Sequence, residues 1–134
     1  MPERGANTSP IAVALALSLG AAVSLGITRF AYGLLLPPMR SDLGWTYAIA
    51  GAMNTSNAAG YFVGALMTPL LFARMRAVTL FISGALVAAL FMMLSGFATD
   101  TLLLIGQRLI AGIASAWTFV AGGVLAARWG ALHP

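Results

Sequence analysis

The residues best suited to chemistry are two arginines inside long apolar runs. Residues 5–28 carry no charged side chain before Arg29, and Arg108 is the one charged residue between positions 101 and 127. A guanidinium is always charged and presents a planar fork of donors that can hold a carboxylate or a phosphate by two hydrogen bonds. The chemistry that these two residues indicate is therefore the binding of an anionic or polar small molecule.

Other polar side chains accompany the arginines. Asn54 and Asn57 are three residues apart and would share a helix face, and Tyr32 stands in the same relation to Arg29. Gln107 is next to Arg108. We expect these six residues to line a pathway for a ligand. Other roles stay open, because an arginine can snorkel to the headgroups, Asn and Gln can bond between helices, and a tyrosine can anchor at the interface.

Few groups in the chain can neutralise these arginines. The three carboxylates, Glu3, Asp42 and Asp100, lie outside the apolar runs or at their ends. The partner is then a set of backbone carbonyls and amide side chains, an acidic residue of another chain or segment, or an anionic ligand.

The composition points to a lipid environment. Hydrophobic residues make up 60% of the 134 positions and charged residues 7%, against about 25% charged in soluble domains. There is no cysteine, no histidine cluster and no pair of carboxylates, so we expect no enzymatic activity, metal site or cofactor. The net charge is +4, but the arginines are scattered, and nucleic-acid binding is not expected.

Four segments are long and apolar enough to cross a bilayer. The fold expected is an all-α membrane protein of four antiparallel, up-and-down helices in one partial domain. The predicted parts are the tail 1–10, spans 11–36, 46–72, 77–98 and 101–127, and the tail 128–134. Pro37 and Pro38 are expected to end the first span.

Depth along these helices places the polar residues together. Arg29 and Arg108 each lie about seven residues from the same end of their spans, or roughly 10 Å deep, and Asn54 and Asn57 lie slightly deeper. Gly60, Gly64 and Gly112 occupy small-residue spacings that let helices approach closely. Such faces serve either fixed packing or sliding of a moving bundle.

The loop arginines predict the orientation in an inner membrane. Arg4, Arg74, Arg76 and Arg128 fall on one side of the predicted spans, and Arg40 falls on the other. The positive-inside rule then puts both termini in the cytoplasm.

Two stretches resemble a known family. Residues 26–66, beginning G-I-T-R-F-A-Y-G, are similar to the YbfB/YjiJ-type branch of the major facilitator superfamily of secondary transporters, and R-L-I-A-G-I-A-S-A at 108–116 resembles its fourth-helix motif. The resemblance implies that Arg108 serves proton transfer or substrate binding and that the first and fourth helices line the central cavity. The loop at 73–76 lacks the aspartate usual in the family.

The resemblance also implies further helices. The family fold has two halves of six helices, and this chain accounts for the first four, so we expect a fragment or truncated product whose partners are the lipid bilayer, the substrate and the missing helices. The alternative is a self-contained four-span structural or regulatory subunit that associates through its small-residue faces. A small multidrug exporter would need a carboxylate within a span, and the sequence has none there.

Overall fold

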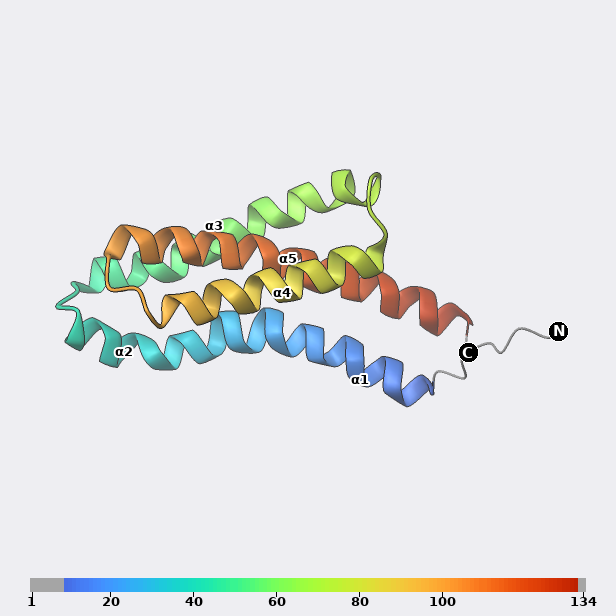
Figure 1. Ribbon diagram of the computed structural model, residues 1–134, viewed down its shortest axis with the longest axis horizontal. Coiled ribbons are helices and arrows are strands. Elements are labelled where there is room, and N and C mark those ends of the chain that lie inside the picture. Colours follow the sequence, from blue (N-terminus) through green and yellow to red (C-terminus); the bar gives the residue numbers. More distant parts are fainter. Residues whose placement is uncertain (1–8, 133–134) are drawn as a thin grey trace.

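The computed structural model describes residues 9–132, which form four antiparallel helical rods (Figure 1). The first rod is continuous from Pro10 to Asp42. Its three parts are α1 (Pro10–Ala21), the π-helix η1 (Ala22–Ala31) and α2 (Tyr32–Asp42). The other rods are α3 (Tyr47–Phe72), α4 (Ala77–Ser95) and α5 (Thr101–Leu132). The described part of the chain is therefore all-helical, as the sequence predicts.

The first rod ends at a glycine and not at the two prolines. Pro37 and Pro38 lie inside α2, so the predicted end at residue 36 is wrong. A proline removes one N–H donor, but its fixed φ is a helical value, and neighbouring groups in a membrane helix can compensate for the lost bond. Gly44 has φ of +64°, and the Trp45 N–H donates to the Arg40 carbonyl at 2.9 Å. The first rod therefore ends in a glycine-based helix terminus.

Polar caps begin two of the other rods. The Thr46 hydroxyl accepts a hydrogen bond from the Ile49 N–H at 3.3 Å, and an Asp100 carboxylate oxygen accepts one from the Leu103 N–H at 2.8 Å. The third helix ends at Ser95 and not at 98, and the fourth runs past 127 to Leu132.

The first rod contains ten residues of π-helix, from Ala22 to Ala31. The wider π turn, in which N–H groups donate to the carbonyl five residues back, changes which side chains share a face. Arg29 is exposed whereas Tyr32 is buried. The prediction that these two share a face assumed α-helical spacing and is wrong for this reason.

The central helix is α5, which packs along α3 and α4 and also contacts η1 and α1. Gly60 and Gly64 of α3 lie against the backbone of Leu109 and Ile113, and Gly112 of α5 lies against the backbone of Asn57. A Cβ atom at any of these three positions would collide with a main-chain carbonyl oxygen. The small-residue spacing thus brings the α3 and α5 backbones into direct contact.

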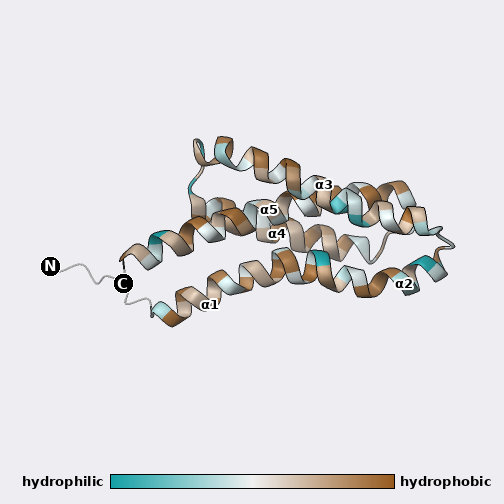
Figure 2. Cartoon of the chain, turned by 180° about the vertical axis from the view of Figure 1, so that it is seen from behind, coloured by the Kyte–Doolittle hydropathy of each residue, from teal (hydrophilic) through white to brown (hydrophobic). Residues whose placement is uncertain are grey.

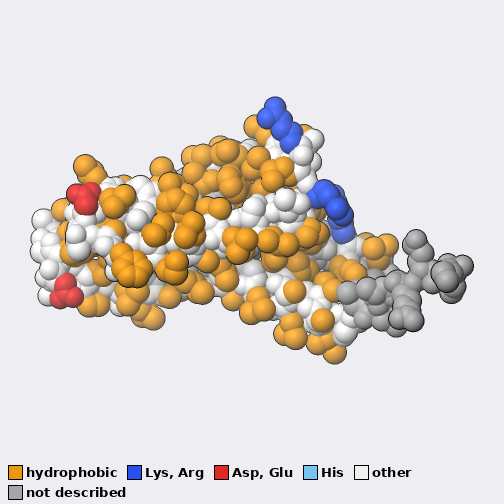
Figure 3. Space-filling view, in the orientation of Figure 1, with side chains coloured by type: hydrophobic (Ala, Val, Ile, Leu, Met, Phe, Trp, Pro, Cys, Tyr) orange, Lys and Arg blue, Asp and Glu red, His pale blue; other side chains and the backbone are white. Residues whose placement is uncertain are grey.

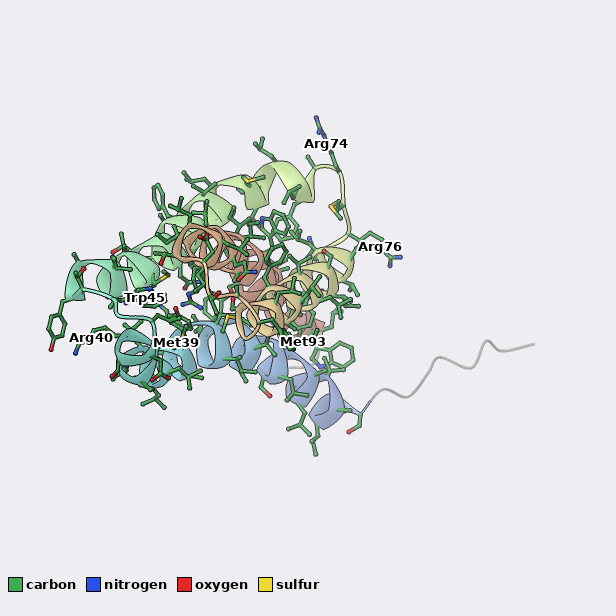
Figure 4. The ribbon with its side chains drawn as sticks, turned by 60° about the vertical axis from the view of Figure 1, so that its left-hand side comes forward. Met39, Arg40, Trp45, Arg74, Arg76 and Met93 are labelled. Atoms are coloured by element: carbon green, nitrogen blue, oxygen red, sulfur yellow. The ribbon has the colours of Figure 1, made fainter. Side chains whose placement is uncertain are left out.

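The outer surface is apolar between two polar ends. Hydrophobic residues dominate the length of the rods (Figure 2), and their side chains cover the middle of the bundle (Figure 3). The aspartates lie at one end of that face, and arginines lie toward the other. Arg74 and Arg76 project from the turn between α3 and α4, far from Arg40 (Figure 4).

Three rods are long and apolar enough to cross a membrane, namely 10–42, 77–95 and 101–132. The α3 helix has 26 residues, enough length for a span. It is not among the three because Asn54 and Asn57 and several small polar residues lower its hydropathy. Three helices of the structure therefore indicate a membrane protein, and α3 lacks a stretch as apolar as theirs.

Candidate functional site

Arg108 lies at the centre of the bundle with none of its surface exposed. It belongs to the face of α5 between the first rod and α4, and every other residue buried as completely is uncharged. An isolated charge in an apolar interior costs several kcal/mol unless partners compensate it. The site is therefore defined by what surrounds this guanidinium.

Two side chains contact the Arg108 guanidinium. Its central carbon lies 3.7 Å from the centroid of the Tyr32 ring, a cation–π geometry, and its Nη1 atom donates a hydrogen bond to the Met92 sulfur at 3.2 Å. Tyr32 comes from the start of α2 and Met92 from α4. A thioether is a weak acceptor, so these contacts neutralise the charge only in part.

Several polar atoms around Arg108 have no hydrogen-bond partner. They are Nε and Nη2 of Arg108, the Tyr32 hydroxyl and the Gln107 side-chain oxygen. Each is buried, and buried polar atoms in native proteins almost always find a partner. No carboxylate within residues 9–132 forms an ion pair with Arg108, since Asp42 and Asp100 lie beyond the ends of the apolar zone. The arrangement can accept an anion with two donors on one edge of the guanidinium.

Asn57 and Gln107 belong to the same region. The Asn57 side-chain nitrogen donates to the Arg108 backbone carbonyl at 3.2 Å, and 3% of Asn57 is exposed. Asn57 thereby fixes α3 to α5 at the level of the arginine. Gln107 is also buried. Of the six predicted pathway residues, the structure brings Tyr32, Asn57 and Arg108 together, and Gln107 is buried next to Arg108 in the chain.

Arg29 and Asn54 lie apart from this group. Both are exposed on the bundle surface. The Arg29 guanidinium carbon is 6.0 Å from the centroid of the Tyr61 ring on α3, and Tyr61 in turn packs near Phe119 of α5. Asn54 is seven residues before Tyr61, so the two lie on the same side of α3. The two arginines therefore occupy different surroundings, and Asn54 and Asn57 do not act on the same surface.

A small hydroxyl cluster holds η1 against α5. The Ser115 hydroxyl donates to the Thr28 hydroxyl at 3.0 Å, and the Thr28 hydroxyl also bonds to the Ser24 carbonyl. Ser24, Thr28 and Ser115 are each about 1% exposed. These bonds dock the π-helix on α5 immediately before α2 begins, and so they place Tyr32 over Arg108.

Two cavities adjoin the arginine site. One of about 480 Å³ lies between α2 and the C-terminal end of α4, and another of about 390 Å³ lies between η1 and α4. Tyr32, Leu35 and Met92 line both cavities. The Arg108 guanidinium thus lies directly behind two side chains that form cavity walls.

Sequence reasoning missed Met92. Methionine is common in apolar helices as a packing residue, and the contact of Met92 with Arg108 spans 16 residues of chain. The depth of Met92 along its helix could have indicated the contact. Met92 lies near the C-terminal end of α4, and Tyr32 and Arg108 lie near that same end of the bundle.

Comparison with protein-family models matches residues 21–133 to a family described as uncharacterised MFS-type transporter YbfB, where MFS denotes the major facilitator superfamily. No curated protein and no solved structure matches the chain. The matched range contains the Arg108 site and all of η1, α2, α3, α4 and α5. A buried arginine in an apolar helical bundle and a family match over most of the chain lead to one conclusion: this protein belongs to the YbfB family of MFS-type transporters.

Proposed function

We propose that the chain forms part of a secondary transporter and carries the group that binds its substrate. The observation that supports this most is Arg108, a wholly buried guanidinium with two unpartnered nitrogens. Such a residue is costly in a bilayer and is typical of substrate or ion pathways. The substrate is a small anionic or polar molecule, because the free donors on Arg108 match an oxyanion.

The other pathway residues take two roles in this proposal. Tyr32 and Gln107 add polar atoms beside Arg108, and Asn57 holds α3 against α5 at the same level. Arg29 lies near Tyr61 on the exposed surface of the bundle, and Asn54 is exposed about two turns earlier on the same side of α3. That side is available to the substrate or to further helices of the same transporter.

The membrane arrangement is part of the proposal. All four rods cross the inner membrane, with both termini and the 73–76 turn in the cytoplasm, and the chain supplies the first four helices of a larger fold. Arg74 and Arg76 at one end and Asp42 and Asp100 at the other support this orientation under the positive-inside rule. Arg4 lies outside the described residues.

The alternative of a self-contained four-span subunit relied on small-residue faces that dock a partner. Gly60, Gly64 and Gly112 are already in contact within the chain, between α3 and α5. No other observation favours the subunit.

The test is ligand binding by the chain in lipid nanodiscs. A panel of small organic anions, cations and neutral compounds is screened for ligands that raise the thermal unfolding temperature. We expect anions among the hits and expect Arg108→Gln to abolish their effect, whereas Arg76→Gln, in an exposed turn, keeps it. Hits that stabilise wild type and Arg108→Gln equally would refute the proposal. Uptake of a confirmed ligand by a full-length family member in proteoliposomes then tests transport itself.

A further inference from the structure

We propose that the ligand of Arg108 is a monocarboxylate with an apolar body, and that the body occupies the cavity between α2 and the C-terminal end of α4. This proposal rests on the proposed function and adds a substrate class to it. It also assigns Met92 and Asp42 to the site, two residues that the family match and the sequence did not single out.

The cavity has the size of a small-molecule site. Its volume is about 480 Å³, within the 300–1,000 Å³ or so that is usual for ligand pockets. Most of its wall is apolar, contributed by Leu35, Pro38, Met39, Leu43, Met92 and Ala98. An apolar wall favours an alkyl or aromatic body and offers little to a sugar or another polyhydroxylated molecule.

The inner wall of the cavity leads to the charge. Tyr32 and Met92 line the cavity, and the same two side chains contact the Arg108 guanidinium. Because Met92 holds Nη1, the Nε and Nη2 atoms on the other edge are left as an unpartnered pair. Two donors on one guanidinium edge match the two oxygens of a carboxylate. The unpartnered Tyr32 hydroxyl provides a further donor nearby.

Tyr32 and Met92 separate the ligand from Arg108 in this structure. A carboxylate reaches the guanidinium only when these two side chains part, and methionine has the flexibility for that movement. Met92 is therefore a positioning residue: it orients the guanidinium while the site is closed and opens the way from the cavity. This role predicts that the shape and sulfur of residue 92 affect affinity, although it carries no charge.

A carboxylate at the rim of the cavity disfavours ligands that carry a second negative charge. Asp42, at the end of α2, lines the cavity away from Arg108 and is exposed. Its carboxylate repels a second negative charge at the far end of the ligand, and at low ionic strength this repulsion extends over about 10 Å or more. The site therefore selects a monoanion over a dianion of the same length.

Equilibrium dialysis with the chain in phosphatidylcholine nanodiscs at low salt tests the proposal. The radiolabelled probes are hexanoate, its dicarboxylate analogue adipate and its neutral analogue hexanamide. We expect hexanoate to bind at least tenfold more tightly than either analogue, since losing a charged hydrogen bond in a buried site costs roughly ten- to a hundredfold in affinity. Equal or tighter binding of adipate or hexanamide would overturn the assignment.

Three variants separate the contributions. Arg108→Gln should abolish hexanoate binding. Asp42→Asn should raise adipate affinity severalfold relative to hexanoate affinity, and a merely structural role of Asp42 would not change this ratio. Met92→Leu keeps the volume and removes the sulfur acceptor, and it should weaken hexanoate severalfold while hexanamide stays as weak as before. Thermal unfolding of each variant verifies that it is folded, and hexanoate affinity unchanged by Arg108→Gln would refute the proposal.

The same chemistry is offered by a fatty acid within the bilayer, so a second arm adds oleate as a competitor. Displacement of hexanoate by trace oleate identifies the membrane as the source, and displacement only by water-soluble acids identifies a free solute. Arg108-dependent binding of inorganic phosphate without hexanoate binding would end this inference and leave the proposed function standing. Absence of Arg108-dependent binding for every anion would end both.

Discussion

The Arg108 guanidinium carbon lies 3.7 Å from the centroid of the Tyr32 ring, although the two residues are far apart in the sequence. This contact joins α5 to the first rod at the level where η1 gives way to α2. A buried cation over an aromatic face gains about 2 kcal/mol, less than the several kcal/mol that burial of an unpaired ion costs. The site is thus kept at the expense of stability.

Replacement of Arg108 by methionine should therefore stabilise the empty protein. Removing a poorly compensated buried charge in favour of an apolar side chain of similar length is expected to raise the free energy of unfolding by about 1–4 kcal/mol. Thermal unfolding in detergent measures this. Arg29→Met is the matched control, because Arg29 is exposed, and should stay within about 0.5 kcal/mol of wild type. A marked loss of stability in Arg108→Met would show that the arginine is a structural residue.

A methyl group at Gly64 should loosen the contact between α3 and α5. An added Cβ would lie 2.5 Å from the Ile113 carbonyl oxygen and 2.8 Å from the Ile113 Cα. Backbone atoms yield only by moving the helices apart, so Gly64→Ala is expected to cost about 1–3 kcal/mol. Gly51, in the same helix, has open space around it, and Gly51→Ala should gain about 0.5–1 kcal/mol. Equal unfolding temperatures for the two variants would contradict the close approach.

Cysteine labelling should place the turn between α3 and α4 in the cytoplasm. The chain has no native cysteine, so Met75→Cys and Ser41→Cys each provide a single target at opposite ends of the bundle. In intact cells an impermeant maleimide should label position 41 and reach position 75 only after permeabilisation. Labelling of position 75 from outside would reverse the proposed orientation, whatever the state of the site.

The sequence predicted the helices better than their ends. Hydropathy located the rods because long apolar runs are local features of the sequence. The end of the first rod was misplaced because Pro37 and Pro38 were expected to stop the helix and Gly44 was not considered. A proline weakens a helix, whereas a glycine with positive φ ends one, and the second effect prevailed here.

The site was predictable in its charge and not in its contacts. Arg29 and Arg108 both lie in apolar runs, yet only Arg108 is buried, so its burial depends on packing. Its pairing with Met92 likewise depends on how α4 lies against α5. The separation of Arg29 from Tyr32 depends on a change of helix type that hydropathy does not encode. Asn54 and Asn57 differ in burial for a similar reason, since only packing decides where a helix face meets its neighbour.

The π-helix also has a consequence for the length of the chain. Ten residues at about 4.4 per turn complete roughly 2.3 turns, and eight residues at 3.6 per turn complete about 2.2. An α-helix would need about two residues fewer than residues 22–31 to make the same rotation from α1 to α2. The wider turns therefore accommodate these extra residues, as they would after an insertion. Deletion of Phe30 and Ala31, which leaves the Ser24–Thr28 spacing intact, should let the segment rewind as an α-helix and keep the unfolding temperature within a few degrees. The same double deletion in α4, at Leu86 and Val87, has no wide turns to absorb it and should turn the helix face from α5; similar unfolding temperatures for both deletions would show that the wide turns hold no spare residues.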